Sequence, residues 1–160
     1  MPRTYAQTKG SSGGGGGTFP KFSVNLGGTN QTGNTSGVFN PVVFNTIVYD
    51  TNSNFDTSTG KFTPTVAGFY AFKSWVYQLG IIPAGGFGAN VLYKNGSPLL
   101  ETFHKLSAGS EDGTGGAWSC EMNGAGDFVQ LYAYFDISAG LNYTISGAIL
   151  DTWWMGERLP

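Results

Sequence analysis

The chain has 160 residues, with 26 glycines, 15% aromatic residues and only 11% charged residues. This length suits one domain, and aromatic and β-branched residues separated by Gly, Asn, Ser and Thr indicate an all-β fold without long helices. A net charge of −2 with scattered basic residues argues against a nucleic-acid partner, and no apolar run is long enough for membrane insertion.

The N-terminal segment reads MPRTYAQTKGSSGGGGG and lacks the apolar core of a signal peptide. We expect residues 1–18 to form a Gly-rich flexible arm, with Gly13 to Gly17 as its most flexible part. The alternative is an arm that becomes ordered in a neighbouring protein. Cys120 is the only cysteine, so no internal disulfide or oxidising compartment is implied.

Short strands separated by turn residues follow along the rest of the chain. The Asn95-Gly96 dipeptide favours a type I′ turn, because both residues tolerate positive φ, and it predicts a hairpin. About ten such strands indicate a sandwich or jelly roll. The expected strands are Lys21–Leu26, Pro41–Asp50, Gly60–Phe62, Thr65–Leu79, Gly88–Lys94, Ser97–Lys105, Ala117–Met122, Asp127–Phe135 and Asn142–Asp151.

Two of these strands, 69–79 and 127–135, carry apolar residues on both faces. A strand of a monomeric sandwich normally has one solvated face. The second apolar face therefore predicts burial against another subunit, with scattered surface aromatics as the simpler alternative. The aromatic residues of that second face are Trp75, Tyr77, Phe128, Tyr132 and Tyr134.

Six motifs occur in a fixed order along the chain. They are PVVF at 41–44, NFDTSTGKF at 54–62, AGFYAF at 67–72, VLYKNGSPLL at 91–100, GDFVQLYAY at 126–134 and TISGAIL at 144–150. In this order they resemble the C1q-like globular-head domain of complement C1q and adiponectin, within the tumour-necrosis-factor-like superfamily. The resemblance covers residues 21–151.

The resemblance implies a ten-strand antiparallel jelly roll packed as a homotrimer, with both termini at one end. Together with the Gly-rich composition of the N-terminal segment, it gives three expected parts: an arm at 1–18, the C1q-like domain at 19–151 and a Trp-containing C-terminal tail at 152–160. The second apolar face becomes the threefold interface. The implied core positions are Phe44, Phe62, Tyr70, Phe72, Val129, Leu131, Gly147 and Ile149.

No residue pattern indicates catalysis, so we expect a protein that is not an enzyme. His104 is the only histidine, which excludes metal sites that need several imidazoles or thiolates. A nucleophilic pair of Cys120 and His104 is conceivable, but a buried thiol and a strand histidine are the simpler interpretation. Glu111 and Asp112 are weak calcium candidates in a Gly-rich loop, with ordinary solvated acids as the alternative. No cofactor is expected.

With no pattern for catalysis or metal binding, we expect the protein to act by binding another molecule. Alternate loops of a jelly roll gather at one end, and loops on a rigid scaffold commonly carry binding residues. The loop candidates are Phe87, Glu111 and Asp112. The candidate anchors to a larger assembly are Gly13, Gly17, Trp153 and Trp154. The alternative for the two tryptophans is a cap on the base of the trimer.

The function we expect is that of a homotrimeric virion surface protein, a head decoration or fibre knob, for example of a bacteriophage. It would be assembled in the host cytoplasm, attached to other virion proteins through its ends, and able to bind a host glycan or protein. The alternative is a soluble extracellular or bacterial-surface module of the same fold that binds a protein or carbohydrate ligand.

Overall fold

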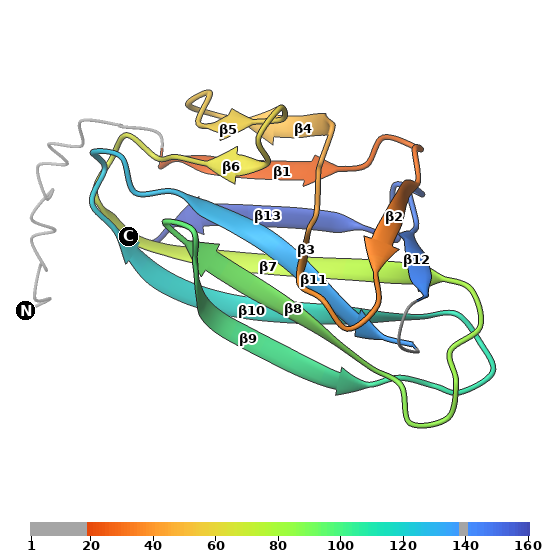
Figure 1. Ribbon diagram of the computed structural model, residues 1–160. Coiled ribbons are helices and arrows are strands. Elements are labelled where there is room, and N and C mark those ends of the chain that lie inside the picture. The colour runs from red at the N-terminus through yellow and green to blue at the C-terminus, as the bar shows by residue number, and fades with distance from the viewer. Residues whose placement is uncertain (1–18, 138–140) are drawn as a thin grey trace, which may run out of the picture.

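The computed structural model describes residues 19–137 and 141–160, and all regular elements in these ranges are β-strands (Figure 1). Two antiparallel sheets pack face to face, one of seven strands (sheet A) and one of six (sheet B). No described segment forms a helix of the length and apolar character that crossing a bilayer requires. The expected anchors Gly13 and Gly17 lie outside the described residues.

Sheet A has β7 near its centre. One edge of β7 pairs with β10 over its whole length, and the other pairs first with β13 and then with β12. Beyond β13 lie β1 and then β4, and beyond β12 lies β2. The strands are β1 (Lys21–Asn25), β2 (Gln31–Thr35), β4 (Thr46–Asp50), β7 (Gly68–Leu79), β10 (Asp112–Met122), β12 (Asn142–Ile145) and β13 (Trp153–Arg158).

Sheet B runs in the order β5-β6-β11-β8-β9, and β3 also pairs with β11. Its strands are β3 (Asn40–Pro41), β5 (Phe55–Asp56), β6 (Lys61–Phe62), β8 (Phe87–Lys94), β9 (Ser97–Lys105) and β11 (Val129–Asp136). The expected hairpin joins β8 to β9, and both turn residues have positive φ, 52° at Asn95 and 81° at Gly96. Lys94 forms an ion pair of 2.9 Å with Asp127, which ties this hairpin to the segment before β11.

The core lies between the sheets and is rich in aromatic rings. Side chains alternate along a strand, so every second residue of β7 and β11 points inward. The ring of Phe22 in β1 stacks on Phe62 at 4.3 Å and meets Trp154 edge-on at 4.9 Å. Of the expected core positions, the structure buries Phe44, Phe62, Tyr70, Phe72, Val129 and Leu131.

The prediction of a separate C-terminal tail at 152–160 is wrong, because residues 153–158 form β13 inside sheet A. Strand β13 pairs with β1 on one side and with β7 on the other. Trp154 is 0% exposed and belongs to the core, so it is not available as an anchor. Trp153 points to the opposite face. Close packing also requires Gly156, since a Cβ there would lie 2.5 Å from the Phe72 ring.

The expected strand 142–151 ends early, at Ile145. A turn follows, in which the Ser146 hydroxyl donates to Asp151 at 2.7 Å and the Asp151 amide donates to the Ala148 carbonyl at 3.0 Å. Ile149 is 61% exposed on this turn, so its expected core position is wrong. Gly147 is buried in the turn, against the backbone of Thr29, and not in a strand of the sandwich.

The expected strand Pro41–Asp50 is also divided, because the chain changes sheet there (Figure 1). Strand β3 ends at Pro41 in sheet B and β4 begins at Thr46 in sheet A. Val42 and Phe44 are buried along the crossing. The ends of the described chain meet, since the Arg158 amide donates to the Pro20 carbonyl at 2.8 Å.

Candidate binding surfaces

The residues expected on one interface lie on two outer faces of the sandwich. Trp75 and Tyr77 point outward from β7 in sheet A, because their neighbours Val76 and Gln78 are buried. Tyr132 and Tyr134 point outward from β11 in sheet B. The two sheets pack against each other, so these outer faces point in opposite directions. One flat contact therefore cannot include all of the expected residues.

Phe128, the fifth expected interface residue, lies just before β11. Its amide donates to the Asn95 side chain at 3.0 Å. The Lys61 ammonium lies 4.1 Å from the centre of its ring, within the range of a cation–π contact. Phe128 thus helps to join β6, the hairpin and β11 at one corner of sheet B.

The outer face of sheet A carries two adjacent tryptophans. Trp75 is the register partner of Trp153, and both are partly exposed. The Trp75 ring lies over Gly113 and Gly115 of β10, where added Cβ atoms would come within 2.8 Å and 2.6 Å of it. These glycines therefore keep the face flat. Tyr77 continues the row, and burial raises its pKa, with smaller effects from Glu111 and Asp151.

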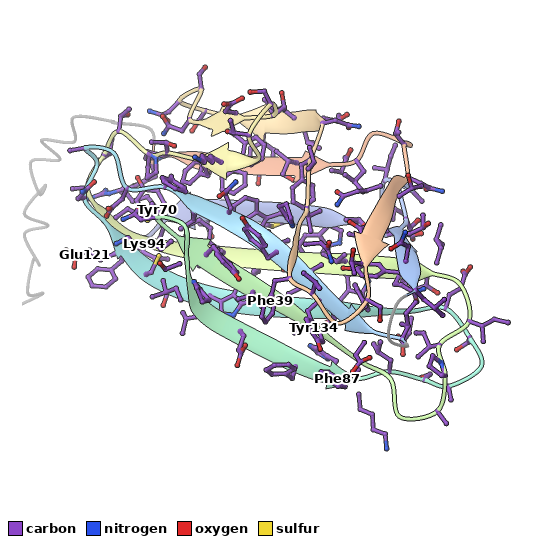
Figure 2. The ribbon with its side chains drawn as sticks, viewed as in Figure 1. Phe39, Tyr70, Phe87, Lys94, Glu121 and Tyr134 are labelled. Carbon is purple, nitrogen blue, oxygen red and sulfur yellow. The ribbon has the colours of Figure 1, made fainter. Side chains whose placement is uncertain are left out.

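The outer face of sheet B carries a continuous row of aromatic rings, here called the aromatic strip. The rings of Tyr93 and Tyr132 stack at 3.8 Å, and Phe39 lies 5.1 Å from Tyr134. Phe87 lies 5.5 Å from Tyr134. Figure 2 shows Phe39, Tyr134 and Phe87 on the side of the molecule that carries β8 and β11. The strip comprises Phe39, Phe87, Tyr93, Phe103, Tyr132 and Tyr134.

Small residues lie beneath the strip along β8. Ala89 is the register partner of Tyr134 and Val91 of Tyr132, so both point to the outer face. Both are nevertheless buried, because the surrounding rings cover them. Burial also raises the pKa of Tyr93, and the neighbouring Tyr132 raises it further. The strip is thus a second packed layer on the outside of the sandwich.

The structure does not place Phe87 among the expected loop residues. It is the first residue of β8 and belongs to the aromatic strip.

The Asp112 carboxylate accepts hydrogen bonds of 2.8 Å from the amides of Ser107 and Gly113. Burial alone would raise the pKa of Asp112, but these hydrogen bonds and the charge of His104 hold it below its usual value.

Glu111 accepts a hydrogen bond of 3.4 Å from the Gly80 amide. Both calcium candidates thus interact with loop backbone. Among residues 19–137 and 141–160, no three His, Cys, Asp or Glu side chains gather where they could hold a metal ion.

His104 and Cys120 have separate partners. The Nε2 atom of His104 lies 2.8 Å from the Gly115 carbonyl oxygen, to which it can donate. Cys120 of β10 is the register partner of Tyr70 in β7, and its Sγ atom lies 3.8 Å from the Met122 sulfur. Burial raises the pKa of the Cys120 thiol. The geometry gives the histidine and the cysteine structural partners rather than a shared reactive site.

Three members of the strip were absent from the sequence-based site. Tyr93 and Phe103 lie at outward positions of β8 and β9, so period-two alternation could have found them. Phe39 precedes the two-residue strand β3, and no periodicity extends that far. Trp153 was expected in a C-terminal tail, as a cap on the trimer base or as an anchor, and its register pairing with Trp75 depends on the unpredicted strand β13.

Residues 22–139 match the C1q domain family. This chain belongs to that family. The mouse (Mus musculus) collagen alpha-1(X) chain is 32% identical over 82 residues, which cover 51% of this chain. The matched region covers only 11% of that collagen chain. The family prediction is thus confirmed, although the family match stops before β13.

Solved structures show the same fold as this C1q domain. The globular domain of zebrafish complement 1qA has a TM-score of 0.59 at 20% identity, covering 89% of this chain and 98% of that one. Murine APRIL at pH 8.0 has a TM-score of 0.64 at 13% identity, with coverages of 88% and 99%. Eiger TNF from S. frugiperda has a TM-score of 0.62 at 13% identity, and the match covers 89% of this chain and 93% of that one. The all-β jelly-roll prediction is confirmed by these matches.

Proposed function

We propose that this C1q domain is a non-enzymatic homotrimeric binding module whose subunits meet through the outer face of sheet A. The observation that carries the proposal is the adjacent pair Trp75 and Trp153, both partly exposed on a regular sheet face. Tryptophan is favoured as a buried anchor in protein interfaces. The expected interface residues of sheet B, Tyr132 and Tyr134, are not part of this revised contact.

The shape of the face supports close approach of a neighbouring subunit. The outward positions of β10 next to Trp75 are Gly113 and Gly115, over which the Trp75 ring lies flat, and Ala117, which adds only a methyl group. Phe69, at the other end of β7, is 58% exposed. Contacts in a closed threefold ring are heterologous, so this face would meet a different surface of the next subunit, such as the open β10 edge.

Light scattering on the full chain tests the trimer. The wild-type protein should have the mass of three chains, and Trp75→Asp should give monomers with an unchanged circular dichroism spectrum. Tyr132→Asp, which changes the other face, should remain trimeric. A monomeric wild-type protein would refute the proposal. A trimeric Trp75→Asp together with a monomeric Tyr132→Asp would move the contact to sheet B.

The biological setting that we propose is the surface of a virion, as a head decoration or fibre knob assembled in a host cytoplasm, for example of a bacteriophage. The low charge, the single cysteine and the Gly-rich segment before the domain support this setting. Because Trp154 lies in the core and Trp153 faces the proposed subunit contact, attachment to other virion proteins would fall to residues 1–18. Deleting these residues should leave the trimer intact and abolish its incorporation into particles.

The alternative setting is an extracellular or bacterial-surface module. The similarity to a collagen chain and to the globular domain of complement 1qA supports this alternative. Finding the protein free in culture medium, with no copy in purified particles, would favour the alternative over the virion setting.

A further inference from the structure

We propose that the aromatic strip on sheet B is a binding site for neutral carbohydrate. The inference rests on the proposed function of a binding module and names a ligand class and a surface for it. The strip lies on the face opposite to the proposed subunit contact, so a trimer could use both. Its two most exposed rings are Phe103, at 55%, and Phe39, at 37%.

The chemistry of the strip suits a sugar ring. The C–H groups on one face of a pyranose are apolar and pack on aromatic rings, while its hydroxyls need hydrogen-bond partners. Within the described part of the chain, the hydroxyls of Tyr93, Tyr132 and Tyr134 have no hydrogen-bond partner. Tyrosine is typical of surfaces that are apolar at one end of the side chain and wet at the other. Apolar surface and free hydroxyls thus occur together.

A carboxylate and a hollow lie beside the rings. Glu101 of β9 is the register partner of Val91, which in turn faces Tyr132, so the carboxylate and the Tyr132 ring flank the same strand. Glu101 is exposed and forms no ion pair or hydrogen bond with the described residues. A hollow of about 280 Å³ lies along this edge and is lined by Val91, Pro98, Leu99, Leu100 and Glu101. A carboxylate can accept two hydrogen bonds from neighbouring sugar hydroxyls.

The charges around the strip favour a neutral ligand. Asp136 and Lys105 lie on either side of Phe87 in the register of sheet B, and Glu101 lies further along β9. Two acids against one base leave the surroundings slightly negative. Sulfated or uronic polysaccharides would be repelled there, because like charges are unfavourable across a contact. Neutral hexopyranose polymers meet no such barrier.

The size of the strip favours a small ligand over a protein. At about 200 Å² for a fully exposed aromatic side chain, the fractions of Phe39, Phe103 and the four partly buried rings give about 500 Å² at most. A standard protein interface needs about 800 Å² from each partner. The strip alone falls short of that area, whereas a few sugar rings would cover it.

Affinity electrophoresis of the full chain tests the site, with gels that contain dextran, yeast mannan, galactan, heparin or alginate. At least one neutral polysaccharide should retard the wild-type protein, and heparin and alginate should not. Phe103→Ala should weaken that binding by about tenfold, the change expected for losing one well-packed aromatic contact. Glu101→Gln should weaken it as well. Phe19→Ala is the matched control, because Phe19 is 49% exposed beside Arg158, belongs neither to the strip nor to the proposed subunit contact, and should bind like wild type.

Light scattering on the same samples separates this inference from the trimer proposal. A trimer that no neutral polysaccharide retards would overturn the carbohydrate site and leave the trimer standing. Retardation by heparin or alginate alone, or an equal loss in Phe19→Ala, would also overturn it. If Phe103→Ala changed the mass of the assembly, the strip would be a subunit contact and the carbohydrate assignment would be wrong.

Discussion

Replacing Trp154 by alanine tests whether residues 153–158 are a core strand. The Trp154 ring lies 4.9 Å from Phe22, 6.0 Å from Phe44, 5.9 Å from Phe55 and 6.1 Å from Phe72. Burying about 200 Å² of apolar surface at about 25 cal/mol per Å² gives an upper figure of about 5 kcal/mol. Large-to-small changes of a core tryptophan cost about 3–5 kcal/mol.

The buried indole N–H group of Trp154 lowers this expected loss of stability. The Trp154 Nε1 atom is buried without a hydrogen-bond partner among the described residues, so the alanine variant removes an unfavourable buried donor. We therefore expect a loss of about 3–4 kcal/mol, a large share of the usual 5–15 kcal/mol of a folded domain. Urea unfolding followed by far-ultraviolet circular dichroism measures the loss, at one subunit concentration, because the stability of an oligomer depends on concentration.

Phe103→Ala is the control for this measurement. Phe103 is also aromatic, but it is 55% exposed and lies outside both the core and the proposed subunit contact. Its replacement should cost less than half as much. Equal costs for the two variants, or a loss below about 1 kcal/mol for Trp154→Ala, would refute the assignment of Trp154 to the core.

Two further changes test the packing and the electrostatics. Gly156→Ala should lower the free energy of unfolding by about 1–3 kcal/mol, because its Cβ would lie 2.5 Å from the Phe72 ring; an unchanged melting temperature would contradict this. Hydrogen bonds from Asn95 and Lys94 lower the pKa of Asp127, so its stabilising effect is present above the unfolded pKa of about 3.9 and is lost as pH falls through the lower folded value. Asp127→Asn should therefore lower the urea midpoint at neutral pH, and the difference from wild type should shrink at about pH 3; parallel pH profiles would exclude this coupling.

The sequence was sufficient for the family and for most of the core, because both depend on local patterns. Tyr70 and Phe72 alternate with outward residues in a strand long enough to show period two. The Asn95-Gly96 turn follows from the backbone freedom of those two residues. Such features need no knowledge of which strands are neighbours.

The errors concern elements that long-range pairing decides. The segment 142–151 contains enough apolar residues for a last strand, so it concealed β13, although Thr152, Trp154 and Gly156 alternate inward as a strand requires. The separation of Trp75 from Tyr132 could not be predicted, because alternation defines two faces of a strand but not the sheet to which it belongs. The order of family motifs along the sequence does not say which strands are neighbours in space, so it does not assign a strand to a sheet.

The central position of β13 has a consequence for the synthesis of the chain. Strand β1 is made first, yet one of its two neighbours, β13, includes Trp154 and Gly156, more than a hundred residues later. Domains dominated by such distant pairings fold slowly. On the ribosome, one edge of β1 and one edge of β7 must wait with unpaired backbone groups until residues 153–158 have emerged. Any pause in translation within the last strand would prolong the exposure of an aggregation-prone half-sheet.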